Sequence, residues 1–434
     1  MMASQTTLDE KFLEFVNAKR TRHKPNAKIH KVPENLRNKN NHDKYYSPRA
    51  VSIGPIHHEN KNLKIGDTYK FTLAAKYVRN TPYTPQFLYK KIFDNISELE
   101  GLFAEDVLVL ANNAESLQGF GSLEEKLSWQ LFVDGCFLLY LMDDGNTQLN
   151  DDEEVPFKGT HLFDLAMNDV FLLENQLPYL VLKLLWKTDN EKELIKTMVK
   201  FLRYNILYRP YMDLPNEPEP PIHLLDLQQK FILTKSDPKM KKQSGKYNLE
   251  SLNAYRNIED LTAIGIKLKL SRTERPFDVD FSEGWFSAEL TLPEIVLNDT
   301  TIGALLNLTA YEMCSPLEND GEICSFVVFI NSLIVHSEDV KKLRSEGILR
   351  NFIGRDEEVV DLFNIIRTDL LYYPDIYGEI TYKIHEHRFK KCKIWLALAY
   401  RTYFSNPWAI IGFFAGVIAL VLTFLQTWFS IYPR

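Results

Sequence analysis

An uninterrupted apolar run near the C-terminus is the feature that most constrains this chain. Residues 408–429 read WAIIGFFAGVIALVLTFLQTWF and contain no charged side chain. A helix rises 1.5 Å per residue, so this run spans roughly 33 Å, enough to cross the hydrocarbon layer of a bilayer. It therefore predicts one transmembrane helix. The side chains expected to anchor it are Trp408, Phe413, Phe414, Leu420, Leu422, Phe424 and Trp428.

Basic residues gather on the N-terminal side of this run, and only Arg434 follows it. Positive side chains stay on the cytosolic face of a membrane, so we expect a cytosolic body with a single-pass C-terminal anchor, and we favour the plasma membrane. The same residues predict contact with anionic lipid. They are Arg388, Lys390, Lys391, Lys393 and Arg401. In the reverse orientation, three N-x-S/T sequons would be open to glycosylation, at Asn95, Asn298 and Asn307.

The remainder of the chain has the composition of a folded protein. Apolar residues make up 45 % of its 434 residues, and its net charge of -7 gives no electrostatic reason to expect nucleic acid as a partner. No two of the four cysteines have the two-residue spacing of a zinc knuckle or redox motif. We interpret them as reduced, with Cys136 as a small core residue.

The residue patterns predict an α+β fold with a predominantly helical body. Five segments follow from the distribution of proline, charge and periodicity. They are a basic N-terminal arm at 1–28, a helical N-terminal half at 29–208, a Pro- and Lys-rich linker at 209–250, an α+β C-terminal half at 251–400, and the transmembrane anchor with a short tail at 401–434.

Two helical patterns in the N-terminal half bear on function. Ser122–Met142 ends in a nearly all-apolar stretch, typical of a helix buried on most sides. His161–Glu174 is helical, and a new helix begins at Pro178, whose missing N–H suits a first turn. Asn175 and Gln176 fall in the break between them, and we expect them to bind the backbone groups that the break frees.

In the C-terminal half the spacing of apolar residues changes from a helical repeat of 3.6 residues to a strand repeat of 2, and then back to the helical repeat. Apolar and polar residues alternate over 264–270, 277–281 and 286–290, which predicts a small antiparallel sheet. Helices follow at Thr300–Met313, at Ser325–Val335, between Ser337 and Gly347, and at Asp356–Leu371.

No common catalytic or nucleotide-binding motif occurs in the sequence. The one constellation with chemical potential is the pair His57-His58, and adjacent histidines point apart on a strand or helix. We favour structural hydrogen bonding for this pair over a metal site or acid–base catalysis. The sequence thus assigns no catalytic, cofactor-binding or metal-ligating residue.

Taken together, these segments resemble a plant-specific family called domain of unknown function 247, from Ile29 to Ser430. The chain departs from the family pattern at Gly66-Asp67, where a Met-Glu pair is usual. The resemblance implies a plant membrane protein without established biochemical activity, and it carries over no catalytic residue. The matching positions, which we interpret as structural, include Pro33, Leu36, Arg37, Gly54, Pro55, His57, His58, Asp134, Glu174, Asn175, Gln176 and Pro178.

These observations favour a non-enzymatic, membrane-anchored recognition or signalling protein that acts through a protein partner. The acidic stretch at 143–154 and the Pro-rich stretch at 214–221 are candidate contact regions. Two alternatives stay open: a hydrolase or metal-dependent enzyme that uses His57 and His58, and a membrane-lipid-binding scaffold.

Overall fold

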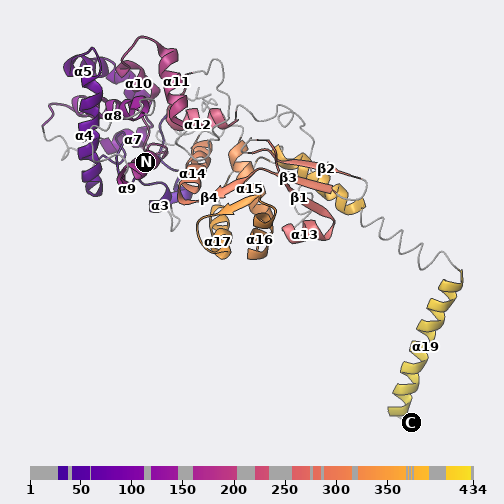
Figure 1. Ribbon diagram of the computed structural model, residues 1–434. Coiled ribbons are helices and arrows are strands. Elements are labelled where there is room, and N and C mark those ends of the chain that lie inside the picture. Colours follow the sequence, from indigo (N-terminus) through magenta and orange to yellow (C-terminus); the bar gives the residue numbers. More distant parts are fainter. Residues whose placement is uncertain are drawn as a thin grey trace, which may run out of the picture.

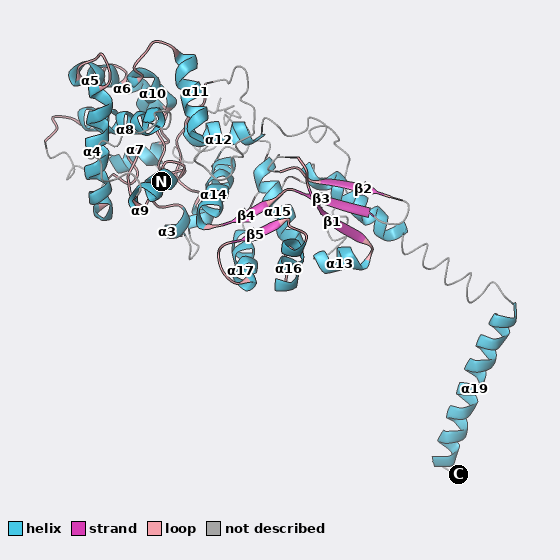
Figure 2. Ribbon diagram, viewed as in Figure 1, coloured by secondary structure: helices cyan, strands magenta, loops and turns pink. Residues whose placement is uncertain are grey.

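Helices build most of the described part of the protein, and within that part strands occur only in the C-terminal half (Figures 1 and 2). The computed structural model describes residues 28–37, 42–58, 60–111, 119–144, 160–202, 220–233, 257–273, 277–284, 288–314, 321–367, 370, 373, 376–390 and 407–431. Residues 1–27 of the predicted arm and most of the predicted linker therefore lie outside the described residues.

The N-terminal half contains α2 (Glu34–Arg37), α3 (His42–Tyr45), α4 (Lys64–Arg79), α5 (Pro85–Phe93), α6 (Ile96–Gly101), α7 (Glu105–Ala111), α8 (Leu123–Asp144), α9 (His161–Asp169), α10 (Tyr179–Leu185), α11 (Glu191–Phe201) and α12 (Leu224–Leu233), with a short 3-10 helix over Lys61–Leu63. The C-terminal half contains α13 (Ile258–Ala263), α14 (Asp299–Cys314), α15 (Glu322–Leu333), α16 (Ser337–Ser345), α17 (Asp356–Arg367), a helix over 376–390, and α19 (Pro407–Ile431).

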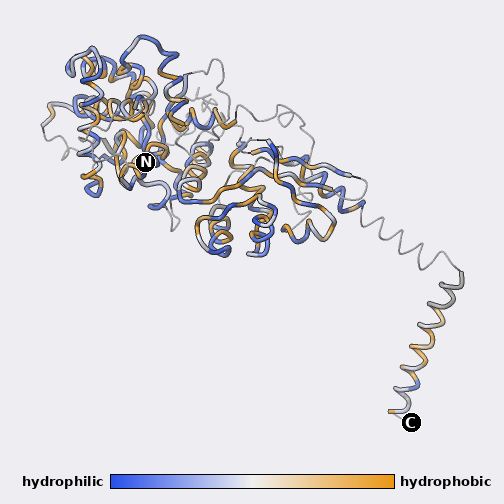
Figure 3. Tube along the Cα trace, viewed as in Figure 1, coloured by the Kyte–Doolittle hydropathy of each residue, from blue (hydrophilic) through white to orange (hydrophobic). Residues whose placement is uncertain are grey.

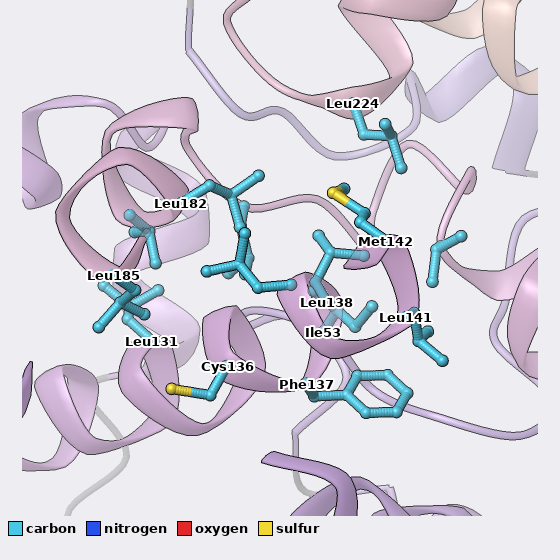
Figure 4. Close-up of a cluster of buried hydrophobic side chains, with 14 of the residues drawn as sticks. Ile53, Leu131, Cys136, Phe137, Leu138, Leu141, Met142, Leu182, Leu185 and Leu224 are labelled. Atoms are coloured by element: carbon cyan, nitrogen blue, oxygen red, sulfur yellow. The ribbon is translucent and has the colours of Figure 1, made fainter. Parts of the chain in front are cut away.

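The core of the N-terminal half forms around α8. Helices α4, α5, α10 and α11 all pack against it. The helix predicted over Ser122–Met142 is confirmed, and in its nearly all-apolar second half Cys136, Phe137 and Leu139 are fully buried. Figure 4 shows side chains from α8 meeting Leu182 and Leu185 of α10 and Leu224 of α12. The prediction that Cys136 is a core residue is confirmed.

The predicted break between two helices is present but wider than expected. Helix α9 ends at Asp169, five residues before Glu174, and α10 begins directly after Pro178. The chain between them forms turns, with backbone bonds from Phe171 to Asn168 and from Asn175 to Leu172. Helix α9 stops early because the polar side chains after it bind backbone outside the helix.

The sheet differs from the predicted antiparallel one. Strands β1 (Ile266–Leu270), β2 (Asp280–Glu283) and β3 (Ala288–Leu292) form a sheet in the order β1-β3-β2. β3 pairs antiparallel with β2 but parallel with β1. A second, two-stranded parallel sheet joins β4 (Ile295–Leu297) to β5 (Leu349–Asn351). Alternation reveals which side chains share a face but not strand direction, so parallel pairing was not predictable from it.

Helix α12 connects the two halves. Leu224, Leu227 and Phe231 belong to the core of the N-terminal half, whereas Leu225 and Ile232 belong to that of the C-terminal half. This helix lies inside the range predicted as a linker, and most of its residues are buried.

Helix α19 occupies the apolar run at the C-terminus, and Figure 1 draws it away from the body. Its tube is largely orange, the colour of apolar residues, in Figure 3. Within the part of the chain that the structure describes, no single helix has the length and hydropathy of a membrane span, and the apolar stretch identified in α19 covers Phe414–Trp428. The side chains of Trp408 and Phe413 lie outside the described residues.

Candidate functional site

The motif residues of the N-terminal half gather around the loop over 45–58. Asp169, at the end of α9, accepts hydrogen bonds from three consecutive backbone N–H groups of this loop. The donors are Arg49 at 3.0 Å, Ala50 at 2.6 Å and Val51 at 3.0 Å. Burial raises the pKa of Asp169, and the three N–H donors partly offset that rise. The carboxylate thus fixes the path of the loop.

Asn175 and Gln176 continue this attachment from the helix break. The Asn175 side chain accepts from the Ile53 N–H at 2.6 Å and donates to the Val51 carbonyl at 3.1 Å. Its amide also donates to the Asp169 carbonyl at 3.0 Å. Gln176 donates to the carbonyls of Val170 and Leu172, which the break frees, and accepts from Leu225 of α12. The predicted task of both side chains is confirmed, and each also reaches a distant segment.

Glu174 joins the first described segment to the same loop. One carboxylate oxygen accepts from the Val32 N–H at 2.7 Å and pairs with the Arg37 guanidinium, and the other lies 3.1 Å from His57 Nε2. Burial raises the pKa of Glu174, but His57, Val32 and Arg37 together outweigh it and hold the pKa below its usual range. Glu174 is therefore the acceptor at which these elements meet.

A buried ion pair lies on the other side of the loop. Lys70 of α4 sits 2.7 Å from Asp134 Oδ1 of α8 and donates to the Ser52 carbonyl at 2.7 Å. Asp134 Oδ2 accepts from the Gly54 N–H at 2.8 Å. His58 is held nearby in partial burial, which lowers its pKa. We call this set of residues, Lys70, Asp134, Asp169, Glu174, Asn175 and Gln176, the loop bracket.

The loop bracket accounts for most of the motif positions. It brings together Arg37, Gly54, His57, Asp134, Glu174, Asn175 and Gln176, with His58 alongside, whereas Leu36 packs in the core and Pro178 caps α10. The sequence analysis did not identify Lys70 or Asp169 as residues of this site. Lys70 had a usable signal, because it follows Gly66 by four residues and precedes Leu73 and Tyr77 on the buried stripe of α4.

A small pocket lies beside the loop bracket, between the loop and the first turn of α14. Its volume is about 30 Å³. A cavity of this size holds a water molecule or two, since drug-sized ligands occupy several hundred Å³. Lys44 and Asp299 form an ion pair of 2.9 Å at its rim. Among the described residues, no three His, Cys, Asp or Glu side chains converge as a metal site would require. An enzyme that uses His57 and His58 stays a prediction.

A second polar cluster lies at the start of α12. His223 is fully buried and its Nδ1 accepts from the Asp226 N–H at 3.1 Å. Tyr311 donates to Asp226 Oδ1 at 3.0 Å, and its ring meets the His223 ring edge-on at 4.9 Å between centroids. Burial lowers the pKa of His223 to about 4.

Acid should therefore destabilise the protein as the pH falls from 6.5 toward 4. The folded pKa of His223 lies below that of the unfolded chain, so the unfolded state binds more protons as the pH falls from 6.5 toward 4. Lowering the pKa from 6.5 to about 4 corresponds to a loss on the order of 3 kcal/mol of unfolding free energy once the pH is below 4. Urea unfolding at several pH values measures this loss. His223→Gln should flatten the decline, and an unchanged decline would assign it to other groups.

Three exposed aromatic side chains and the half-buried Tyr89 form a continuous row across three helices of the N-terminal half. Phe71 of α4, Trp129 of α8, and Tyr89 and Phe93 of α5 follow one another with ring centroids 6.5, 6.2 and 6.1 Å apart. Phe71 is 56 % exposed, and Trp129 and Phe93 are each 38 % exposed. Phe132 packs against both Trp129 and Tyr89 from the buried side. We call Phe71, Trp129, Tyr89 and Phe93 the aromatic row.

The structure describes two of the five basic residues that precede α19. Lys390 pairs with Glu283 of β2 at 3.0 Å and with Glu386 at 3.4 Å, and Arg388 is exposed on the same helix. Lys391, Lys393 and Arg401 lie outside the described residues.

Comparisons with known proteins agree with the family resemblance of the sequence. A family profile described as DUF247, plant protein of unknown function, matches residues 29–422. UPF0481 protein At3g47200 of Arabidopsis thaliana is 26 % identical over 424 residues, which cover 92 % of this chain and 85 % of that protein. Putative UPF0481 protein At3g02645 of the same plant is 25 % identical over 173 residues, or 39 % of this chain and 32 % of the relative. No solved structure gives a significant match. Since the profile covers most of the chain, this protein belongs to the DUF247 family of plant proteins of unknown function.

Proposed function

We propose that this protein is a membrane-anchored recognition protein, held by α19 and acting through a protein partner that docks on the aromatic row. Its body lies in the cytosol, and the plasma membrane is the favoured location. The observation that carries the proposal is the aromatic row itself, because a rigid helical surface exposes large aromatic side chains to solvent.

The apolar surface of α19 supports the proposal that this helix anchors the protein in a membrane. Described side chains from Phe414 to Trp428 are exposed on all sides of the helix, and the sequence continues this apolar run on both flanks. The hydroxyls of Thr423 and Thr427 donate to the carbonyls four residues earlier, each at 2.7 Å. Such bonds spare a hydroxyl from facing hydrocarbon unpaired. The basic residues before the run support the cytosolic orientation.

The surroundings of the aromatic row support recognition of a protein. Aromatic residues are enriched at the centres of protein interfaces, where they bury large areas at low entropic cost. Lys64 lies two turns before Phe71 on α4, and Lys90 lies one turn before Phe93 on α5, both exposed. We therefore expect the partner to present apolar side chains flanked by acidic ones. The candidate contact regions at 143–154 and 214–221 lie almost entirely outside the described residues.

Proximity labelling in plant cells with the full chain tests this role. The test variant is Phe71→Glu/Lys90→Glu, which reverses the character of the row without touching the core. The matched control is Phe352→Glu, since Phe352 is 68 % exposed in the other half. We expect proteins enriched by the wild type and the control to be lost with the test variant, as interface hot spots cost about 2 kcal/mol or more. An unchanged set of neighbours in the test variant would rule out the row as the contact surface.

A further inference from the structure

The helix over 376–390 is fixed rigidly to the body along one face. Tyr377 stacks on Phe329 of α15 at 5.0 Å between centroids and donates to the Phe277 carbonyl at 3.1 Å. Ile380 and Ile384, about one and two turns after Tyr377, are buried in the same core. Near its end, His387 Nδ1 lies 3.0 Å from Glu283 Oε1 of β2. The helix therefore moves with the body as one unit.

Its opposite face carries aromatic side chains toward solvent. Tyr382 is 48 % exposed and Phe389 is 53 % exposed. The His385 ring packs against the Phe389 ring in a tilted arrangement, with the centroids 4.6 Å apart. Spacings of three and four residues place all three rings on one side of the helix. This aromatic stripe has the amphipathic chemistry of residues that sit among lipid headgroups.

Two lysines of the helix, Lys383 and Lys390, form ion pairs with glutamates of the protein. Lys383 pairs with Glu379 at 2.6 Å, and Lys390 pairs with Glu283 and Glu386. Pairing of these two lysines lowers the net positive charge of the helix itself, and with it the long-range attraction of the helix to anionic lipid. We therefore expect any lipid contact of this helix to depend on aromatic insertion and only weakly on salt.

We propose that this helix lies along the bilayer interface, with Tyr382 and Phe389 among the headgroups, and so sets the orientation of the body. The inference rests on the anchoring part of the proposed function. Chain continuity favours lipid as the occupant, because only 16 residues, 391–406, separate the helix from α19. In Figure 1 this yellow helix lies beside β2 at one end of the body.

Photo-crosslinking with the full chain in phosphatidylcholine–phosphatidylserine vesicles tests the proposal. A benzoylphenylalanine replaces Phe389, Tyr382 or, as the control, Phe352, and lipid adducts are quantified by mass spectrometry. We expect several-fold more lipid adduct at 389 and 382 than at 352, with little change at high salt. Vesicle flotation is measured on the same samples.

The outcomes separate the two claims. Protein that fails to float with the vesicles would overturn the anchor and the inference with it. Protein that floats but gives no more lipid adduct at 389 than at 352 would overturn the inference alone. Adducts to protein in place of lipid at 389 would likewise overturn it, because they would identify the stripe as a protein contact.

Discussion

Replacing Gly66 with alanine is expected to destabilise the protein by about 3 kcal/mol or more, although alanine is normally the better helix former. Gly66 lies in the first turn of α4, where a Cβ would come within 1.7 Å of the Ala50 carbonyl oxygen and 2.7 Å of its carbon. Both contacts are to backbone, so no side chain can rotate away. The loop would have to leave α4, and with it the attachment to Asp169.

The matched control is Gly303→Ala in α14. An added Cβ there meets nothing within 4 Å, so the helix should gain up to about 1 kcal/mol. Urea unfolding of the two variants, followed by circular dichroism, compares them directly. Opposite signs would confirm the close approach of loop and helix, whereas a Gly66→Ala variant as stable as the wild type would disprove it.

Lys70→Met should cost about 3–5 kcal/mol, because it leaves the fully buried Asp134 without its cation. Burial alone would lower the pKa of Lys70, but Asp134 and Asp67 outweigh it and raise the pKa. The pair therefore persists at neutral pH. Neutralising the partner as well, in Lys70→Met/Asp134→Asn, should recover part of the loss, since no uncompensated charge then remains.

A surface pair of similar geometry supplies the comparison. Lys342 of α16 and Glu346, the residue that follows this helix, lie 2.6 Å apart but are exposed, so Lys342→Met should cost less than about 1 kcal/mol. Urea unfolding measures all three variants. Equal losses for Lys70→Met and Lys342→Met would show that the buried pair does not hold α4 to α8. A double variant less stable than Lys70→Met would contradict the proposed source of the loss.

Local signals in the sequence predicted α8, the start of α10 and the helices α14 to α17. The apolar second half of α8 and the proline before α10 each act within one or two turns, so their effect is visible in the sequence alone. Strand pairing is different. The parallel partners Leu268 and Leu290 are 22 residues apart, and β5 lies far from β4 in the chain. No pattern in neighbouring residues therefore indicates either strand pairing.

The loop bracket was predictable in role but not in partners. Asn175 and Gln176 were expected to bind backbone freed at the break, and they do. Their bonds to Ile53 and Leu225 join segments that only the fold brings together. The same holds for Asn307, a sequon residue that is fully buried and bonds Leu173 and Tyr45. A glycan at Asn307 is incompatible with this fold, so glycosylation mapping should rely on Asn95 and Asn298.

Alkaline carbonate extraction of plant membranes that contain the full chain tests the anchor most directly. Carbonate strips peripheral proteins but leaves a spanning helix in the bilayer. We expect the wild type to stay in the membrane pellet, and a variant with Leu420→Arg and Leu422→Arg in α19 to be released. Wild-type protein recovered in the soluble fraction, without detergent, would contradict the account.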